Sequence, residues 1–128
     1  MLEMITVAIV FYQQSSRTYG SFVSAAQLLG ANVIAVHDMA HYSSAAKGER
    51  LTDSAMTAVK SWGAHVVVQR NPENGSSHRV ASKLDEMDTG ALTINAGAGT
   101  EEHPTQALAD AYTIFKEFGN LAIWTIYE

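Results

Sequence analysis

Short runs of β-branched and other apolar residues alternate with longer segments of helical spacing along this chain. The runs are Ile5 to Tyr12, Asn32 to Val36, His65 to Gln69 and Ala91 to Asn95. Continuous apolar runs are typical of strands buried on both faces of a parallel sheet, and parallel strands need helical crossovers between them. The pattern predicts an α/β fold: a single three-layer α/β/α domain with a central, mostly parallel sheet.

Helices are predicted between and after these strands. Their ranges are Thr18 to Leu29, Thr52 to Trp62, Ser77 to Leu84 and Pro104 to Phe118. In the first helix, the spacing of Phe22, Ala25, Ala26 and Leu29 predicts one buried stripe. The segment from His37 to Arg50 has little periodicity, which predicts a long loop of the kind that often carries function.

The length and charge of the chain exclude several classes of protein. A chain of 128 residues has room for one domain. Its last apolar run, Leu121 to Tyr127, predicts one more strand. The net charge of -5 and the absence of a Lys or Arg cluster argue against a nucleic-acid surface. The first apolar run has about seven residues, against about 20 for a membrane span. We expect no membrane partner.

The absence of cysteine excludes a disulfide framework, a thiolate nucleophile and a thiolate metal site. It fits a reducing compartment, and the cytoplasm is the expected location. The remaining histidines do not have the spacing of metal ligands; they are His37, His41, His65 and His78. We therefore expect no metal.

The tetrapeptide Ser15-Ser16-Arg17-Thr18 follows the first predicted strand and opens a helix. Ligands of open α/β sheets bind at the carboxyl ends of the strands, and a helix N-terminus offers N–H groups to an anion. Three hydroxyls and a guanidinium there would suit a phosphate. A plain Ser/Thr helix cap is the alternative interpretation.

Three further polar spots follow later in the chain. Arg70 comes directly after a strand and could fork onto phosphate oxygens, although a lone Arg there is commonly solvated. His103 begins a helix and would stay neutral, donating to a carbonyl oxygen, unless it only caps or packs. Lys47 lies in the long loop and could close over an anion, or face solvent.

The glycine-rich turn Ala96-Gly97-Ala98-Gly99 suggests a dinucleotide site at first sight. The Gly-x-Gly-x-x-Gly spacing fails, because Glu102 stands at the last position. We reject a dinucleotide cofactor for that reason.

In this order, the segments resemble the aspartate/ornithine carbamoyltransferase family over nearly the whole chain. The stretch Phe11 to Thr18, followed by Ser21-Phe22, is similar to the family's phosphate loop and the helix after it. The stretches Asn95 to Gly99 and His103 to Asp110 are similar to its second signature. Thr105 and the Lys47 loop are similar to the aspartate branch rather than the ornithine branch.

The resemblance implies a role for each polar spot. Residues that would bind the phosphate of carbamoyl phosphate are Ser15, Ser16, Arg17, Thr18 and Arg70. His103 would contact the carbamoyl carbonyl oxygen and Gln106 the carbamoyl amide. Arg17, Thr18 and His103 would stabilise the oxyanion formed when aspartate attacks, and no cofactor is needed.

The resemblance also implies an assembly. Ser43 and Lys47 would reach into the active site of the adjacent subunit of a homo-oligomer, expected to be a trimer. Residues 1–120 would form the carbamoyl-phosphate-binding domain, and residues 121–128 would begin a second, amino-acid-binding domain that is truncated or absent. A second chain could supply that domain.

The chain departs from the family pattern in ways that leave two hypotheses open. Gln13 replaces a usual Glu, Ala98 a usual Asp and Tyr19 a usual basic residue, and the family's leading helix is missing. Under the first hypothesis the chain is part of a working aspartate carbamoyltransferase of pyrimidine biosynthesis, inactive alone. Under the second it is a non-catalytic anion-binding or oligomerisation module.

Overall fold

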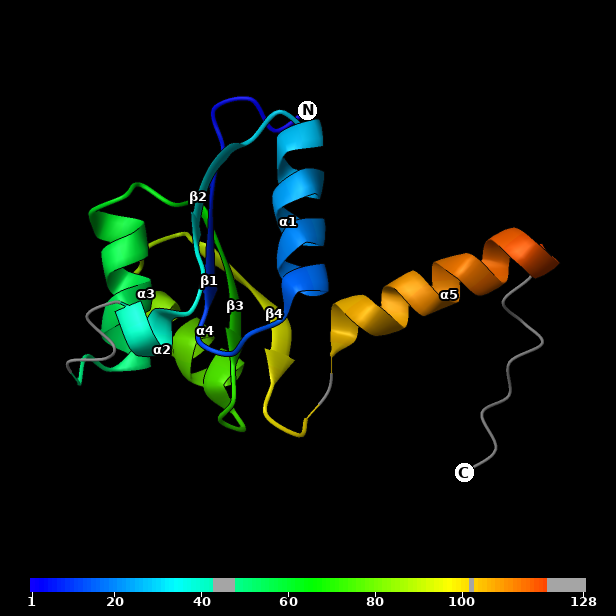
Figure 1. The fold of residues 1–128 in the computed structure, drawn as a ribbon. Coiled ribbons are helices and arrows are strands. Elements are labelled where there is room, and N and C mark those ends of the chain that lie inside the picture. The colour runs from blue at the N-terminus through cyan, green and yellow to red at the C-terminus, as the bar shows by residue number, and fades with distance from the viewer. Residues whose placement is uncertain (43–47, 102, 120–128) are drawn as a thin grey trace.

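A computed structural model of the chain describes residues 1–42, 48–101 and 103–119 (Figure 1). Its elements in chain order are β1 (Thr6–Phe11), α1 (Ser16–Leu28), β2 (Asn32–Val36), α2 (Met39–Tyr42), α3 (Leu51–Lys60), β3 (Val66–Asn71), α4 (Ser76–Glu86), β4 (Leu92–Ala98) and α5 (Pro104–Phe118). The predicted strand from 121 to 127 lies outside the described residues.

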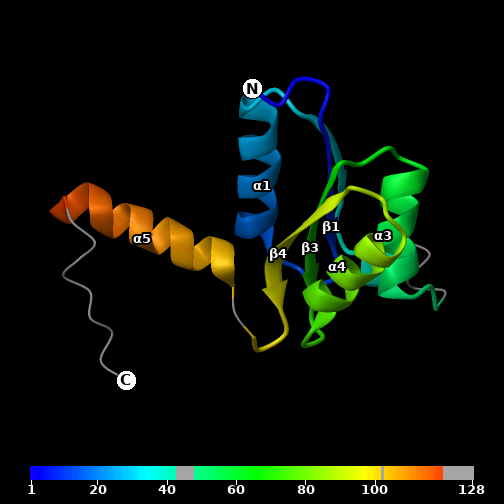
Figure 2. The same cartoon turned by 180° about the vertical axis from the view of Figure 1, so that it is seen from behind.

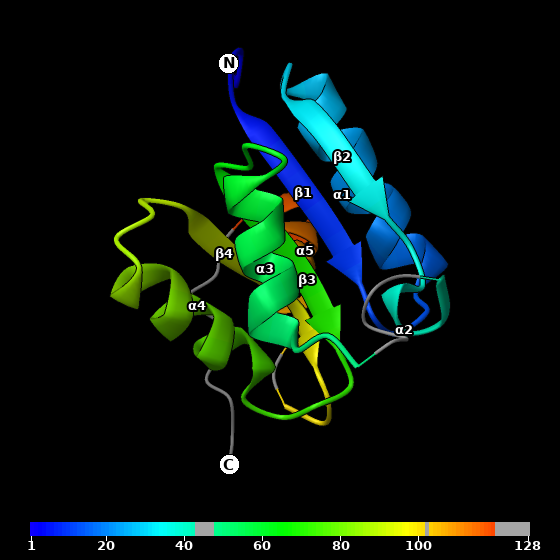
Figure 3. The same cartoon turned by 90° about the vertical axis from the view of Figure 1, so that its left-hand side faces the viewer.

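The described strands form one parallel sheet in the order β2-β1-β3-β4. Helix α1 covers one face of it, and α3 and α4 cover the other (Figure 3). Side chains alternate between the faces, so Ile9 and Val68 pack toward α1 whereas Val10 and Val67 pack toward α3. The predicted three-layer α/β/α architecture is confirmed.

The buried stripe of α1 lies one turn earlier than the spacing predicted. Tyr19, Phe22, Val23 and Ala26 pack against the sheet, whereas Ala25 is exposed and Leu29 is 48% exposed. The cause is the short connection from β1, which brings the first turn of α1 onto the strand. The rings of Phe11 and Tyr19 meet edge to face at 5.4 Å.

The segment from 37 to 50, predicted to be loop throughout, contains the short helix α2. Met39 is only 4% exposed and packs in the core beside Ala8 and Val10, and this contact accounts for the ordered turn. Asp38 turns the chain with a φ of 58° and pairs with His41 at 2.6 Å between Oδ1 and Nδ1. Residues 43–47 lie outside the described part of the chain.

Strand β4 continues through the glycine-rich segment that was predicted to be a turn. Gln69 pairs with Asn95 and Asn71 with Ala98, so one residue of β3, Arg70, faces two of β4. This irregularity is a β-bulge, and it accommodates Gly97 with a φ of 122°. The bulge places Arg70 beside the end of β4.

Helix α5 leads away from the sheet and the other helices (Figures 1 and 2). It has no buried residue, and Leu108, Tyr112 and Phe118 are 62–70% exposed. None of the described helices is both long enough and apolar enough to cross a membrane.

Leu84 on α4 tests the core directly, because its side chain is 1% exposed. We expect Leu84→Ala to lower the free energy of unfolding by about 2–5 kcal/mol in urea denaturation followed by circular dichroism. The matched control is Leu28→Ala on α1, where the leucine is 80% exposed. Its effect should stay within about 0.5 kcal/mol; equal losses from the two variants would contradict this packing.

Candidate functional site

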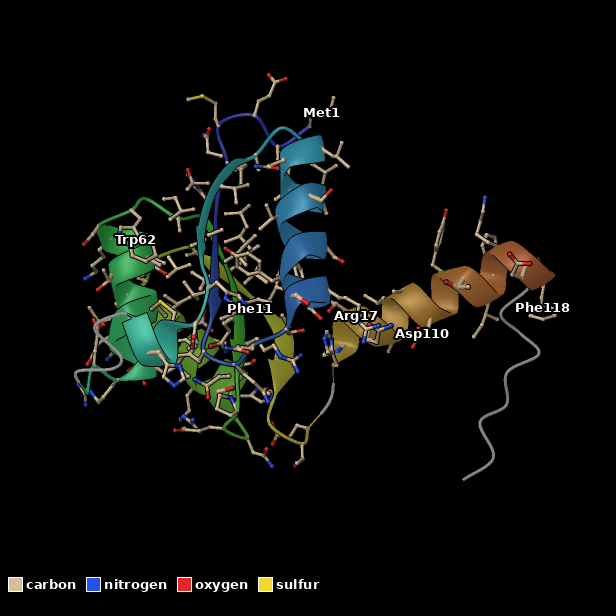
Figure 4. All side chains as sticks on the ribbon, viewed as in Figure 1. Met1, Phe11, Arg17, Trp62, Asp110 and Phe118 are labelled. Carbon is tan, nitrogen blue, oxygen red and sulfur yellow. The ribbon has the colours of Figure 1, made fainter. Side chains whose placement is uncertain are left out.

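A cleft of about 730 Å³ lies between α1, the end of β3 and the first turns of α5. Its walls are formed by Ser15, Arg17, Thr18, Ser21, Phe22, Ala25, Arg70, His103, Thr105, Gln106 and Ala109. Figure 4 labels Arg17 at the start of α1, on the side toward α5. Apart from Ser16, the described residues predicted to bind carbamoyl phosphate all come together here.

Ser16, the first residue of α1, is the exception and does not line the cleft. It lines a neighbouring hollow of about 320 Å³ with Gln14 and His37. Ser43 and Lys47, predicted to reach an adjacent subunit, lie outside the described residues.

The N-terminus of α1 forms one end of the cleft. Ser15 occupies the N-cap position but its hydroxyl makes no capping hydrogen bond, so the alternative interpretation as a plain side-chain cap does not hold. The first N–H groups of a helix have no intrahelical partner, and the helix dipole favours negative charge there. Together with the Arg17 guanidinium, this end of the cleft suits an anion.

Arg70 forms the floor of the cleft and is held by the strand beside it. Its Nη1 donates to the carbonyl oxygen of Ala96 at 3.0 Å. A Cβ on Gly97 would lie 2.5 Å from the same nitrogen, so the close approach requires glycine. The buried Nε has no hydrogen-bond partner in the described structure, and an anion in the cleft would remove that unfavourable state.

His103 combines the two roles that the sequence left open, because it caps α5 and also lines the cleft. Its Nδ1 accepts from the backbone N–H of Gln106 at 3.3 Å and lies 3.1 Å from the Thr105 hydroxyl. A neutral ring with Nδ1 as acceptor carries its proton on Nε2. Burial, and then the charge of Arg70, lowers the pKa of the imidazole. The site therefore keeps His103 neutral as a donor.

Gln106 is oriented by the next turn of α5. Its Nε2 donates to Asp110 at 2.9 Å, so the side-chain carbonyl oxygen is the group left to accept a hydrogen bond. An amide N–H of a ligand is a suitable donor to that oxygen. The cleft thus offers cations, a neutral imidazole donor and an amide acceptor.

Sequence reasoning did not single out Ala25 and Ala109 as walls of the cleft. Each stands four residues after a polar residue of the same helix, Ser21 on α1 and Thr105 on α5, so the helical repeat placed them on one face. The Ser21 hydroxyl donates to the carbonyl oxygen of Arg17 at 2.8 Å. Small residues at these positions leave the space between the helices open.

Comparison with known proteins agrees with this geometry. The family model described as aspartate/ornithine carbamoyltransferase, carbamoyl-P binding domain, matches residues 1–116. The chain belongs to the aspartate/ornithine carbamoyltransferase family. The family resemblance of the sequence signatures is confirmed, and so is its closeness to the aspartate branch, as the following relatives show.

The curated relatives are aspartate carbamoyltransferase catalytic subunits. That of Salinispora arenicola is 47% identical over 117 residues, which are 91% of this chain and 35% of the relative. That of Parafrankia is 47% identical over 116 residues, again 91% of this chain and 35% of the relative. The chain therefore spans about a third of the length of these carbamoyltransferases.

Solved carbamoyltransferase structures share the fold. Aspartate transcarbamoylase from Trypanosoma cruzi, in complex with carbamoyl aspartate and phosphate, has a TM-score of 0.80 at 35% identity, covering 94% of this chain and 34% of that one. The same enzyme with carbamoyl phosphate has a TM-score of 0.78 at 36% identity, covering 93% and 34%.

The neutral state of His103 can be measured by nuclear magnetic resonance titration of its ring protons. We expect its pKa to lie below the ordinary value of 6.5, and to rise in Arg70→Met because one of the two depressing influences is removed. Arg70→Lys keeps the charge and is the control, in which the pKa should stay low. An unchanged pKa in Arg70→Met would show that the two side chains do not interact.

Proposed function

We propose that this chain forms the carbamoyl-phosphate half of an aspartate carbamoyltransferase active site. The observation that supports this most strongly is the meeting of Arg17, Arg70 and His103 in one cleft, because three distant segments supply complementary groups for one small ligand. The chain spans about a third of the length of its curated relatives, and the proposal concerns this part of the site.

Carbamoyl phosphate would lie with its phosphate toward the start of α1, where Ser15, Arg17 and Thr18 offer hydroxyl, guanidinium and backbone N–H donors. Arg70 would donate from the floor of the cleft through its guanidinium. The carbamoyl oxygen would accept from His103, and the carbamoyl amide would donate to Gln106. Each group of the ligand thereby meets the opposite kind of hydrogen-bonding partner.

With carbamoyl phosphate bound in this geometry, the only further reactant needed would be an amine nucleophile. The aspartate amine would attack the carbamoyl carbon to give a tetrahedral intermediate; a carbon–nitrogen bond forms and the bond from carbon to the phosphate oxygen then breaks. The amine loses a proton and phosphate leaves. Arg17, Thr18 and a neutral His103 would stabilise the negative charge on the former carbonyl oxygen. Thr105 and the Lys47 loop favour aspartate as the acceptor.

The proposed assembly is a trimer in the cytoplasm, within pyrimidine biosynthesis. Ser43 and Lys47 would complete the cleft of the adjacent subunit, although both lie outside the described residues. Such a contribution would help to enclose the ligand, since a small ligand needs enclosure to be desolvated. An additional domain or chain would supply the groups that bind aspartate.

Binding of inorganic phosphate and of carbamoyl phosphate by this chain tests the first half of the proposal. In calorimetric titration, Arg17→Ala should weaken both ligands by about 10- to 100-fold, the loss expected for a charge-assisted hydrogen bond. Arg50→Ala is the matched control, because its side chain is 81% exposed and outside the cleft. If neither ligand gives a heat of binding at millimolar concentration, the proposal is wrong.

The second half of the proposal is tested with oligomers that mix two variants. The protein used carries this domain together with an aspartate-binding domain. His103→Ala should lower kcat by about 100-fold or more, as for a lost oxyanion donor, and Lys47→Ala should be similarly poor. Mixing the two variants should restore carbamoyl aspartate formation, because some mixed sites receive both intact residues. If the protein binds the ligand but forms no carbamoyl aspartate, and mixing the variants restores none, the non-catalytic module is favoured instead.

A further inference from the structure

The loop that follows β3 is joined by hydrogen bonds to the loop that follows β4. Asn74 accepts from the backbone N–H of Thr100 at 3.0 Å and donates to its hydroxyl at 3.2 Å. The carboxylate of Glu101 accepts from the backbone N–H of Gly75 at 2.7 Å. We call these contacts between Asn74, Gly75, Thr100 and Glu101 the loop latch.

The two loops approach each other too closely for a side chain between them. A Cβ on Gly99 would lie 2.0 Å from Asn74 Oδ1 and 2.7 Å from the carbonyl oxygen of Pro72. The backbone N–H of Gly99 donates to the carbonyl oxygen of Asn71 at 2.9 Å. The main chains of the two loops are therefore in direct contact beside the latch, and this contact fixes the distance between the loops.

The β3 side of the latch is fixed to helix α4. Arg79 on α4 donates to the carbonyl oxygen of Asn74 at 2.9 Å and to Glu73 at 2.6 Å. Helix α4 has no side-chain cap of its own at Gly75, so Glu101 takes that place from the other loop. A carboxylate at a helix N-terminus is favoured by the helix dipole.

The latch residues are close in sequence to the two groups that the cleft must hold together. Arg70 is the residue before Asn71, and His103 follows Glu101 by two positions. None of the latch side chains lines the cleft. Arg70 and His103 both lie close to Gly97, where a Cβ would be 2.5 Å from Arg70 Nη1 and 3.6 Å from His103 Cδ2. Their relative position therefore depends on how the two loops are joined.

We infer that Asn74 and Glu101 are positioning residues, which hold His103 against Arg70 so that one ligand can meet both side chains. The identity of that ligand as carbamoyl phosphate rests on the proposed function. The relation between the two loops rests only on the contacts described above.

Asn74→Ala and Glu101→Ala open the latch from its two sides. We expect each to weaken carbamoyl phosphate binding by about five- to tenfold in calorimetric titration, the order of effect of a lost hydrogen bond. The pKa of the His103 imidazole should rise toward its ordinary value in the same variants, because the ring moves away from Arg70 and toward solvent.

Two further variants separate positioning from simple stabilisation. Glu101→Gln keeps an acceptor oxygen for the Gly75 N–H and should restore both readouts. Glu86→Ala removes an exposed carboxylate paired with Lys83 at the other end of α4 and should change neither. A latch variant that only lowers the melting temperature, with affinity and the His103 pKa unchanged, would overturn the inference.

The latch and the proposed function fail in different ways. If the unmodified chain binds neither phosphate nor carbamoyl phosphate, the proposed ligand is wrong, but the His103 pKa in Asn74→Ala still reports on the latch. If the unmodified chain binds and the latch variants bind equally well with an unchanged His103 pKa, only the inference about positioning is wrong.

Discussion

Parallel pairing of β1 with β2 and β3, and of β3 with β4, places the carboxyl ends of all these strands at the same edge of the sheet. The site depends on this arrangement. Arg17 follows β1, Arg70 lies near the end of β3 and His103 follows β4, so segments distant in sequence meet at this edge. The backbone N–H of Tyr12 donates to the backbone carbonyl oxygen of Arg70 at 2.8 Å, and this hydrogen bond joins the ends of β1 and β3.

The chain has a net negative charge, but positively charged groups line its cleft. The net charge is -5, yet Arg17, Arg70 and the N-terminus of α1 converge on one hollow. Burial, and then the charge of Arg70, lowers the pKa of His103 and favours its neutral form. The fixed cations suit a phosphate, and the neutral ring suits a carbonyl oxygen, so adjacent groups can serve different parts of one ligand.

Helix α5 combines cleft residues at its start with exposed apolar residues along the rest of its length. Its first turns bear His103, Thr105 and Gln106 at the cleft, whereas Leu108, Tyr112 and Phe118 expose much of their apolar surface. The chain spans about a third of the length of its curated relatives. Because the cleft residues and the apolar residues belong to one helix, a contact made along α5 would act on the cleft as well.

The sequence by itself determined the type and order of the described strands and long helices, because local periodicity decides whether a segment buries a stripe or two faces. It also placed Arg17, Arg70 and His103 at strand ends, and the family signatures assigned them a common ligand. Only the tertiary structure decided that Ser16 lies outside the cleft, that the buried stripe of α1 is shifted by one turn, and that β4 continues through Gly97. The last two features accompany contacts between different elements: Phe11 on β1 against Tyr19 on α1, and Arg70 on β3 against Ala96 on β4. A bulge and its register arise from hydrogen bonds between strands, which no local pattern encodes.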